Sequence, residues 1–163
     1  MNKIPKKIAT ALMVFCGGVF VDSSAIAQNA PPQETGWSTS CLSDQVCELK
    51  TEINSGGNVA ARISVFNIRG MFFFQYTIPL GVDIKQGIFI KIDEEGQPIT
   101  TRLSNCTGNG CTGSFELTTP VIQSMKQGNN LAILFSSPTT QDSFAITFSL
   151  SGFTANFAKI INQ

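Results

Sequence analysis

Cysteine is the residue type in this 163-residue chain whose number and spacing point most directly to chemistry. After residue 27 four cysteines form two close pairs, Cys41 with Cys47 and Cys106 with Cys111. Such thiols can form disulfides, bind zinc or act as a redox pair. The steps of six and five residues differ from the C-x-x-C spacing of zinc knuckles and thiol oxidoreductases. Disulfides are therefore the favoured interpretation.

Four cysteines allow three disulfide connectivities, of which we predict the two local pairs. Chain-entropy estimates give each short loop about 2 kcal/mol and a bond between the distant pairs ~4 kcal/mol, so energy alone would favour the long-range connection. Geometry favours the local pairs instead. The Gly-rich spacer Thr107–Gly110 easily brings two Cα atoms to the ~5.5 Å that a disulfide needs.

Other catalytic chemistry has little support in the sequence. The chain contains no histidine, which removes Ser-His-Asp and Cys-His catalysis and imidazole metal ligands. Asp93, Glu94 and Glu95 could form a cation site or an acid–base pair, but Asp93–Pro98 is typical of a solvated turn. No phosphate-binding or dinucleotide-binding glycine motif occurs. We therefore predict a protein that is not an enzyme and has no cofactor and no metal site.

The first residues predict a secretory signal peptide. Three lysines precede an apolar run from Ile8 to Val21, and an A-x-A site ends at Ala27, after which we expect cleavage. The run is shorter than the ~20 residues needed to cross a bilayer, and no later stretch is long or apolar enough to span one. Cys16 follows the large Phe15, which disfavours a lipoprotein site. The protein is expected in the periplasm or at the cell surface.

The remaining chain is expected to be one domain. Residues 28–36, which contain Pro31 and Pro32, predict a flexible leader, and residues 37–163 predict a single globular unit. Loss of residues 1–27 leaves eight basic and ten acidic residues, a net charge of about −2. Because there is no basic run, neither nucleic acid nor an anionic membrane surface is an expected partner.

Short apolar segments between turn signals predict an all-β domain. Trp37 is expected to be a core anchor, with ligand stacking as the alternative. Met71–Ile78 predicts a central strand buried on both faces, with an exposed aromatic strip as the alternative. Ile88, Ile90 and Ile92 are expected to face one way. The other expected strands cover residues 37–41, 46–54, 59–68, 99–104, 114–117, 130–136 and 143–150.

Two short helices are expected beside these strands. Thr119 as N-cap, Pro120 at the first helical position and closure at Gly128 predict a helix in mid-chain. At the C-terminus four apolar residues recur at helical spacing and predict a helix that docks on the sheets: Phe153, Phe157, Ile160 and Ile161.

The order of these features resembles the invasion-associated locus B family of exported alphaproteobacterial proteins. The resemblance spans nearly all of residues 28–163 and implies an immunoglobulin-like β-sandwich outside the cytoplasm, linked in some members to host-cell invasion. It implies no defined functional residues. The residues that carry it are Trp37, Cys41, Cys47, Pro79-Leu80-Gly81-Val82, Gly87, Ile92-Asp93, Cys106, Gly110-Cys111, Lys126, Gly128 and Ser149–Ala155.

The expected function is that of an exported, non-enzymatic binding or envelope-associated protein whose partner is an unidentified protein or envelope component. Its candidate binding loops are Ser55–Asn58, Asp93–Gln97 and Thr107–Gly110, because loops on a rigid scaffold carry recognition. Within them the candidate residues are Ser55, Asn58, Asp93, Glu94, Glu95 and Asn109.

Two alternatives stay open. One is a periplasmic redox or stress protein that uses a cysteine pair. The other is a subunit or inhibitor of another envelope protein, contacted through Phe72 or Phe74.

Overall fold

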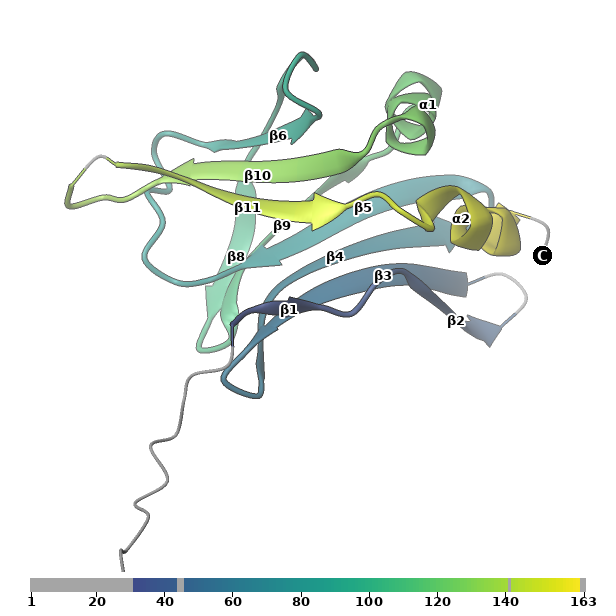
Figure 1. Ribbon diagram of the computed structural model, residues 1–163, viewed down its shortest axis with the longest axis horizontal. Helices are drawn as coiled ribbons and strands as arrows, with labels where there is room; N and C mark the ends of the chain where they lie inside the picture. The colour runs from purple at the N-terminus through teal and green to yellow at the C-terminus, as the bar shows by residue number, and fades with distance from the viewer. Residues whose placement is uncertain (1–30, 44–45, 141, 162–163) are drawn as a thin grey trace, which may run out of the picture.

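Two antiparallel sheets and two short helices form the fold in the computed structural model, which describes residues 31–43, 46–140 and 142–161. The predicted signal peptide lies outside the described residues. Figure 1 shows the smaller sheet crossing above the larger one, with the C-terminal helix at one end of the space between them. The expected all-β sandwich with two helices is confirmed.

The larger sheet, sheet A, has the strand order β1-β3-β4-β5-β9-β8, and β2 also pairs with β3. Its turns follow the glycine signals of the sequence. Arg69 and Gly70 both have positive φ values, 54° and 83°, as the tight turn between β4 and β5 requires. The strands are β1 Gln33–Glu34, β2 Ser38–Ser43, β3 Val46–Ser55, β4 Asn58–Ile68, β5 Met71–Ile78, β8 Leu103–Thr107 and β9 Gly110–Glu116.

The smaller sheet, sheet B, has the order β11-β10-β6-β7. Ile88, Ile90 and Ile92 are all buried, which confirms that they share the inner face of β6. The strands are β6 Ile88–Ile92, β7 Ile99–Thr101, β10 Asn130–Ser136 and β11 Ser143–Ser149.

Helix α1 (Thr119–Gln127) begins one residue earlier than predicted. Thr118, not Thr119, is the N-cap, and its side chain makes no capping hydrogen bond. Since both positions hold threonine, local sequence could not separate them. Pro120 lies in the first turn, and Gly128 ends the helix by donating its N–H to the carbonyl of Ser124 at 2.8 Å.

Helix α2 (Phe153–Ile161) docks as predicted at one end of the sandwich. Phe153, Phe157 and Ile160 are buried, and Trp37 meets the Phe153 ring edge-on with 5.1 Å between centroids. Trp37 is 8% exposed, which confirms its role as a core anchor. Ile161 was expected on the same apolar face but is 43% exposed, so the prediction was wrong for that residue.

Strand β5 is central in sheet A, between β4 and β9, but it is not buried on both faces. Phe74, Tyr76 and Ile78 are fully buried, whereas Phe73, Gln75 and Thr77, which point to the other face, are half-buried. A two-layer sandwich has only one core face per sheet, which a continuous apolar run does not reveal.

The side chain of Tyr76 on β5 is fully buried on the core face of sheet A and is closely packed there. Its hydroxyl donates to the backbone carbonyl of Arg102 at 3.2 Å. Burial raises the pKa of this hydroxyl, and a hydrogen bond with Thr101 lowers that pKa in part. A side chain at Gly113 would place Cβ only 2.1 Å from the Tyr76 oxygen, so glycine is required opposite the ring.

The segment predicted as a flexible leader is partly a strand. Gln33 and Glu34 form β1 and pair with Asn54 and Ile53 of β3. Both carboxylate oxygens of Glu34 accept the backbone N–H of Ser149, at 3.0 and 3.1 Å. Since this contact joins residues far apart in the chain, local composition could not reveal it.

Candidate functional site

Both cysteine pairs are disulfides with the predicted local connectivity. Cys41 lies opposite Cys47 in the β2–β3 ladder, and Cys106 lies opposite Cys111 in the β8–β9 ladder. The Cα atoms of each pair are 4.0 Å apart. Each disulfide therefore joins neighbouring strands that are already paired, and both belong to sheet A.

Two of the three predicted loops meet on the outer face of sheet A. The turn at Asn58 and the turn Thr107–Gly110 border one hollow of about 590 Å³, which we call the sheet A hollow. Ser55, also a candidate residue, is exposed but does not line it. The hollow is lined by Asn58, Val59, Arg62, Thr77, Thr107, Gly108, Asn109, Gly110 and Thr112.

The floor of the sheet A hollow is polar. Arg62, Thr77 and Thr112 lie opposite one another on β4, β5 and β9, and the two threonine hydroxyls are 3.3 Å apart. Arg62 Nε lies 2.8 Å from the Oε1 atom of Glu52 on β3, an ion pair that lacks hydrogen-bond alignment. Because the guanidinium is already compensated, the hollow offers hydroxyl and amide groups without a free charge.

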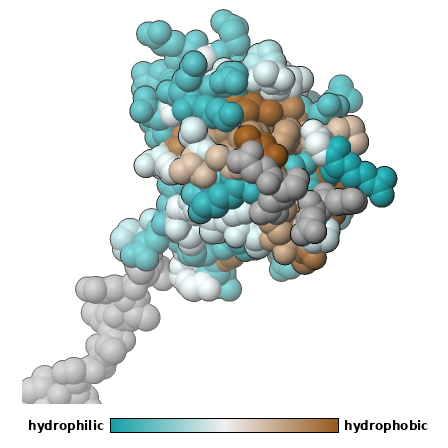
Figure 2. Space-filling view, turned by 90° about the vertical axis from the view of Figure 1, so that its right-hand side faces the viewer, coloured by the Kyte–Doolittle hydropathy of each residue, from teal (hydrophilic) through white to brown (hydrophobic). Residues whose placement is uncertain are grey.

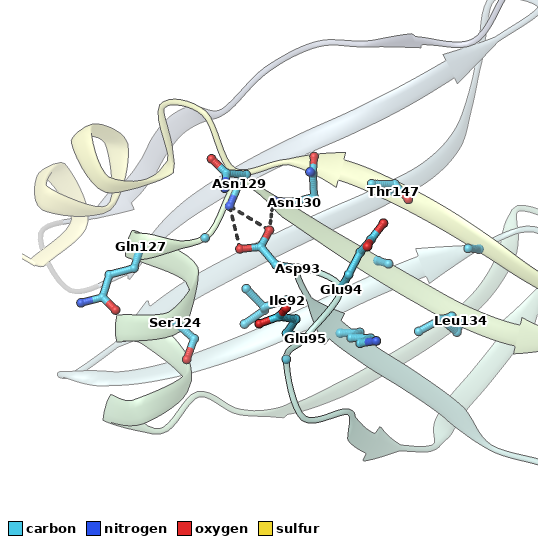
Figure 3. Close-up of a pocket in the computed structure, with 15 residues that line it drawn as sticks. Ile92, Asp93, Glu94, Glu95, Ser124, Gln127, Asn129, Asn130, Leu134 and Thr147 are labelled. Carbon is cyan, nitrogen blue, oxygen red and sulfur yellow. Dashed lines mark hydrogen bonds between the residues drawn. The ribbon is translucent and has the colours of Figure 1, made fainter.

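The third predicted loop lies on the other sheet. Glu94 and Glu95 border a hollow of about 920 Å³ on the outer face of sheet B, which we call the sheet B hollow. Figure 3 shows Glu94 extending toward Thr147 of β11, while Glu95 points to the side of Ser124 on α1. Apolar residues form much of the hollow: it is lined by Lys91–Gly96, Ser124, Gln127–Asn130, Ala132, Leu134, Ala145 and Thr147.

Asp93 differs from its acidic neighbours because its carboxylate is engaged. Oδ1 accepts the backbone N–H groups of Asn129 and Asn130 at 3.0 and 2.9 Å, and Oδ2 accepts that of Asn129 at 3.2 Å, as the dashed lines in Figure 3 show. The backbone N–H of Asp93 also donates to the Asn130 carbonyl at 2.9 Å. These bonds hold the chain between α1 and β10, and they give Asp93 a structural role that its position in a turn did not predict.

The apolar floor of the sheet B hollow was missed in the sequence. Residues Ala132 and Leu134 of β10 lie opposite Thr147 and Ala145 of β11, all on the side away from the core. Phe89 of β6, opposite Leu134, is 36% exposed. The signal was present, because β10 and β6 carry apolar residues at successive positions instead of alternating with polar ones.

Apolar side chains are also exposed around the end of the sandwich where α2 lies. Figure 2 faces this end and shows apolar atoms gathered at its centre. Leu42 is 93% and Met71 51% exposed. The predicted contact residues Phe72 and Phe74 do not contribute: Phe74 is fully buried, and Phe72 packs against the ring of Phe157 with 4.9 Å between centroids.

The part of the chain that the structure describes contains no group of three or more His, Cys, Asp or Glu residues that could hold a metal ion. Within the same residues no helix is long and apolar enough to cross a membrane.

Comparison with known proteins places these features in a family. The family model described as "Invasion associated locus B (IalB) protein" matches residues 37–161. Invasion protein B homologues of two Brucella abortus strains, 2308 and 9-941, are each 26% identical over 137 residues, covering 78% of this chain and 78% of each relative.

A solved structure shares the fold. The crystal structure of invasion associated protein B from Bartonella henselae superposes with a TM-score of 0.70 at 21% identity, covering 77% of this chain and 92% of that one. The family match covers both disulfides, both outer hollows and α2. The chain therefore belongs to the invasion-associated locus B family.

Proposed function

We propose that this protein is an exported, non-enzymatic binding protein of the bacterial envelope, acting in the periplasm or at the cell surface. The observation that carries the proposal is the pairing of Cys41 with Cys47 and of Cys106 with Cys111 as disulfides. Disulfides persist in oxidising compartments, which bacteria maintain outside the cytoplasm. The lysine-rich, apolar first residues with their A-x-A site supply the route.

The binding role is supported by the two outer hollows. Each is bordered by turn residues on a rigid sheet, an arrangement suited to recognition. The family's link with invasion supports a partner met during contact with host cells in species that enter them.

A structural role for the disulfides is part of the proposal. One cysteine of each pair, Cys47 or Cys111, is at most 3% exposed, and each bond ties strands that are already paired. We expect alkylation of freshly lysed cells, followed by mass spectrometry, to find both pairs oxidised and resistant to mild reductant. Free thiols at Cys106 and Cys111 would favour the redox alternative instead.

Location tests the proposal directly. The full chain with a C-terminal tag is expressed in an alphaproteobacterium, and intact cells are shaved with protease before the periplasm is released. We expect a processed chain beginning at Gln28, digested on intact cells or protected until the outer membrane opens. The matched control lacks residues 2–27 and should stay in the cytoplasm. Cytoplasmic retention of the unprocessed full chain would contradict export.

A further inference from the structure

Strand β11 is an edge strand whose outward backbone groups can be assigned. At its end, the Ser149 N–H donates to Glu34 and the Ser149 carbonyl accepts the indole N–H of Trp37 at 2.8 Å. The next residue, Leu150, donates in the opposite direction, to the Asn129 carbonyl. Since backbone groups alternate sides along a strand, those of Ser143, Ala145 and Thr147 also point away from β10.

These outward groups form an open edge among the described residues. Glu34 and Trp37 close only the last position, and no hydrogen bond from described residues reaches the outward groups of Ser143, Ala145 or Thr147. Natural sheets protect such edges with charged side chains, proline or bulges. The β11 sequence, Ser-Phe-Ala-Ile-Thr-Phe-Ser, has no charge and no proline, and its ladder with β10 runs without a register shift.

The open edge borders the sheet B hollow. Ala145 and Thr147 expose both their outward backbone groups and their side chains, which line the hollow. Two rows of side chains lead from the edge across the sheet: Ala145–Leu134–Phe89 and Thr147–Ala132–Lys91. The first row is entirely apolar. A strand added beside β11 would continue both rows.

The charge around the hollow is negative. Asp93 is engaged by backbone N–H groups, but no hydrogen bond or ion pair from the described residues reaches the carboxylates of Glu94 and Glu95. Lys91 is the only cationic residue among those that line the hollow. Glu94 extends toward Thr147, so its carboxylate lies on the edge side of the hollow (Figure 3).

We propose that the β11 edge and the sheet B hollow bind an extended peptide segment of a partner protein, which adds an antiparallel strand beside β11. The open backbone supplies the ladder, and the hollow selects alternate side chains. In an antiparallel register, the peptide residue opposite Thr147 comes first and carries a basic side chain that reaches Glu94. The residue two positions later lies opposite Ala145 and is apolar, because it continues the row to Leu134.

This inference rests on the proposed binding function and adds the class of partner. The test uses the purified protein with both disulfides formed and a synthetic peptide, acetylated Ser-Val-Lys-Val-Leu-Val-Ser amide. Titration followed by NMR should shift the amide signals of Ser143, Ala145 and Thr147. Two matched peptides test the two contributions: one with Glu in place of Lys should bind about tenfold more weakly, and one N-methylated at the Lys and Leu amides, which face β11, should not bind.

Variants of the protein test the contribution of the Glu94 charge separately from that of the open backbone edge of β11. We expect Glu94→Lys to weaken binding of the lysine peptide about tenfold and to strengthen binding of the glutamate peptide, because the charge pair is reversed. Glu116→Lys makes the same change on the exposed end of β9 in sheet A and should leave affinity unchanged.

The inference is overturned if the N-methylated peptide binds equally well, if Glu94→Lys has no effect, or if the shifted amides lie outside sheet B. A concentration-dependent dimer in sedimentation, joined through β11, would overturn it in favour of a second copy of this chain. Failure of the lysine peptide to bind would overturn this inference alone, because it has no bearing on export. Cytoplasmic location would contradict the proposed function and would not alter a peptide affinity measured in solution.

Discussion

The two sheets of the sandwich differ in their disulfides, in the residues of their outer faces and in their exposed edges. Sheet A carries both disulfides, and its outer face has a polar row in which Arg62 is paired with Glu52. Sheet B has no disulfide among its described residues, an apolar outer row through Leu134, and the open edge of β11. Both sheets belong to one fold, yet among the described residues only sheet A is braced by disulfides and by ion pairs.

The difference suggests separate roles for the two sheets, with sheet A holding the fold together and sheet B carrying the proposed binding surface. Residues that complete their contacts within the molecule, as Arg62 and Glu52 do in sheet A, gain less from a partner, which leaves hydroxyl and amide groups as what the sheet A hollow offers. Apolar side chains and backbone groups without internal contacts, as in sheet B, gain most from a partner that covers them. We therefore expect substitutions in sheet A to alter stability more than binding, and those on the outside of sheet B to do the reverse.

The largest expected effect comes from the residue that joins the two sheets. Trp37→Ala removes a buried ring, its contact with Phe153 and the hydrogen bond to Ser149. We expect the free energy of unfolding to fall by about 4 kcal/mol, measured by calorimetry because the only tryptophan is lost. A loss below about 1 kcal/mol would show that the sheets hold together without this anchor.

Removal of a disulfide should affect sheet A alone. The double substitution Cys106→Ala and Cys111→Ala is expected to lower the free energy of unfolding by about 2 kcal/mol, since the bond restrains the unfolded chain. Hydrogen exchange should accelerate in β8 and β9, while the order of protection within sheet B stays the same. Equal local acceleration in β10 and β11 would contradict the division between the sheets.

Two neighbouring carboxylates in one turn, Asp93 and Glu94, test the proposed division between structural and binding residues. Asp93→Ala leaves the N–H groups of Asn129 and Asn130 without their carboxylate, so we expect a loss of about 2 kcal/mol in denaturant unfolding. Glu94→Ala, the matched control, should change stability by less than about 0.5 kcal/mol, because it removes no hydrogen bond or ion pair to a described residue. Equal effects would mean that the two carboxylates do not have separate structural and binding roles.

The smallest expected effect is a loss of folding stability at alkaline pH. The pKa of Tyr76 is raised in the folded protein, so the unfolded chain loses its tyrosine proton first as pH rises above about 10. Stability contributed by the neutral hydroxyl is thus full below that pH and falls above it, by up to about 1.4 kcal/mol per pH unit.

Tyr76 is the only tyrosine, so tyrosinate absorbance reports on it alone. Tyr76→Phe should remove this component of the alkaline loss. A variant with the same pH dependence as the original chain would place the cause elsewhere.

Local elements were predictable because their signals are local. The break between the expected strands 59–68 and 71–78, the alternation of Ile88, Ile90 and Ile92, and the spacing of Phe153 and Phe157 are all signals that act within a few residues. The same locality explains the local disulfides, whose cysteines lie opposite each other across short hairpins.

The arrangement of the candidate site was not predictable in the same way. Asn58 and Asn109 line one hollow only because β4 and β9 both pair with β5, and Asp93 meets Asn129 across 36 residues. Such contacts depend on strand order. Strand β1 was also not predictable from local composition, because Glu34 is held by a hydrogen bond from the backbone N–H of Ser149, near the other end of the chain.

The short separation within each cysteine pair has a kinetic consequence. Thiols five or six residues apart collide far more often than thiols separated by about sixty, because loop-closure entropy grows with loop length. During oxidative folding the native bonds should therefore form first and suppress the other two connectivities. Each bond then holds its two strands in register before the distant strands meet, so correct assembly should depend little on a disulfide isomerase.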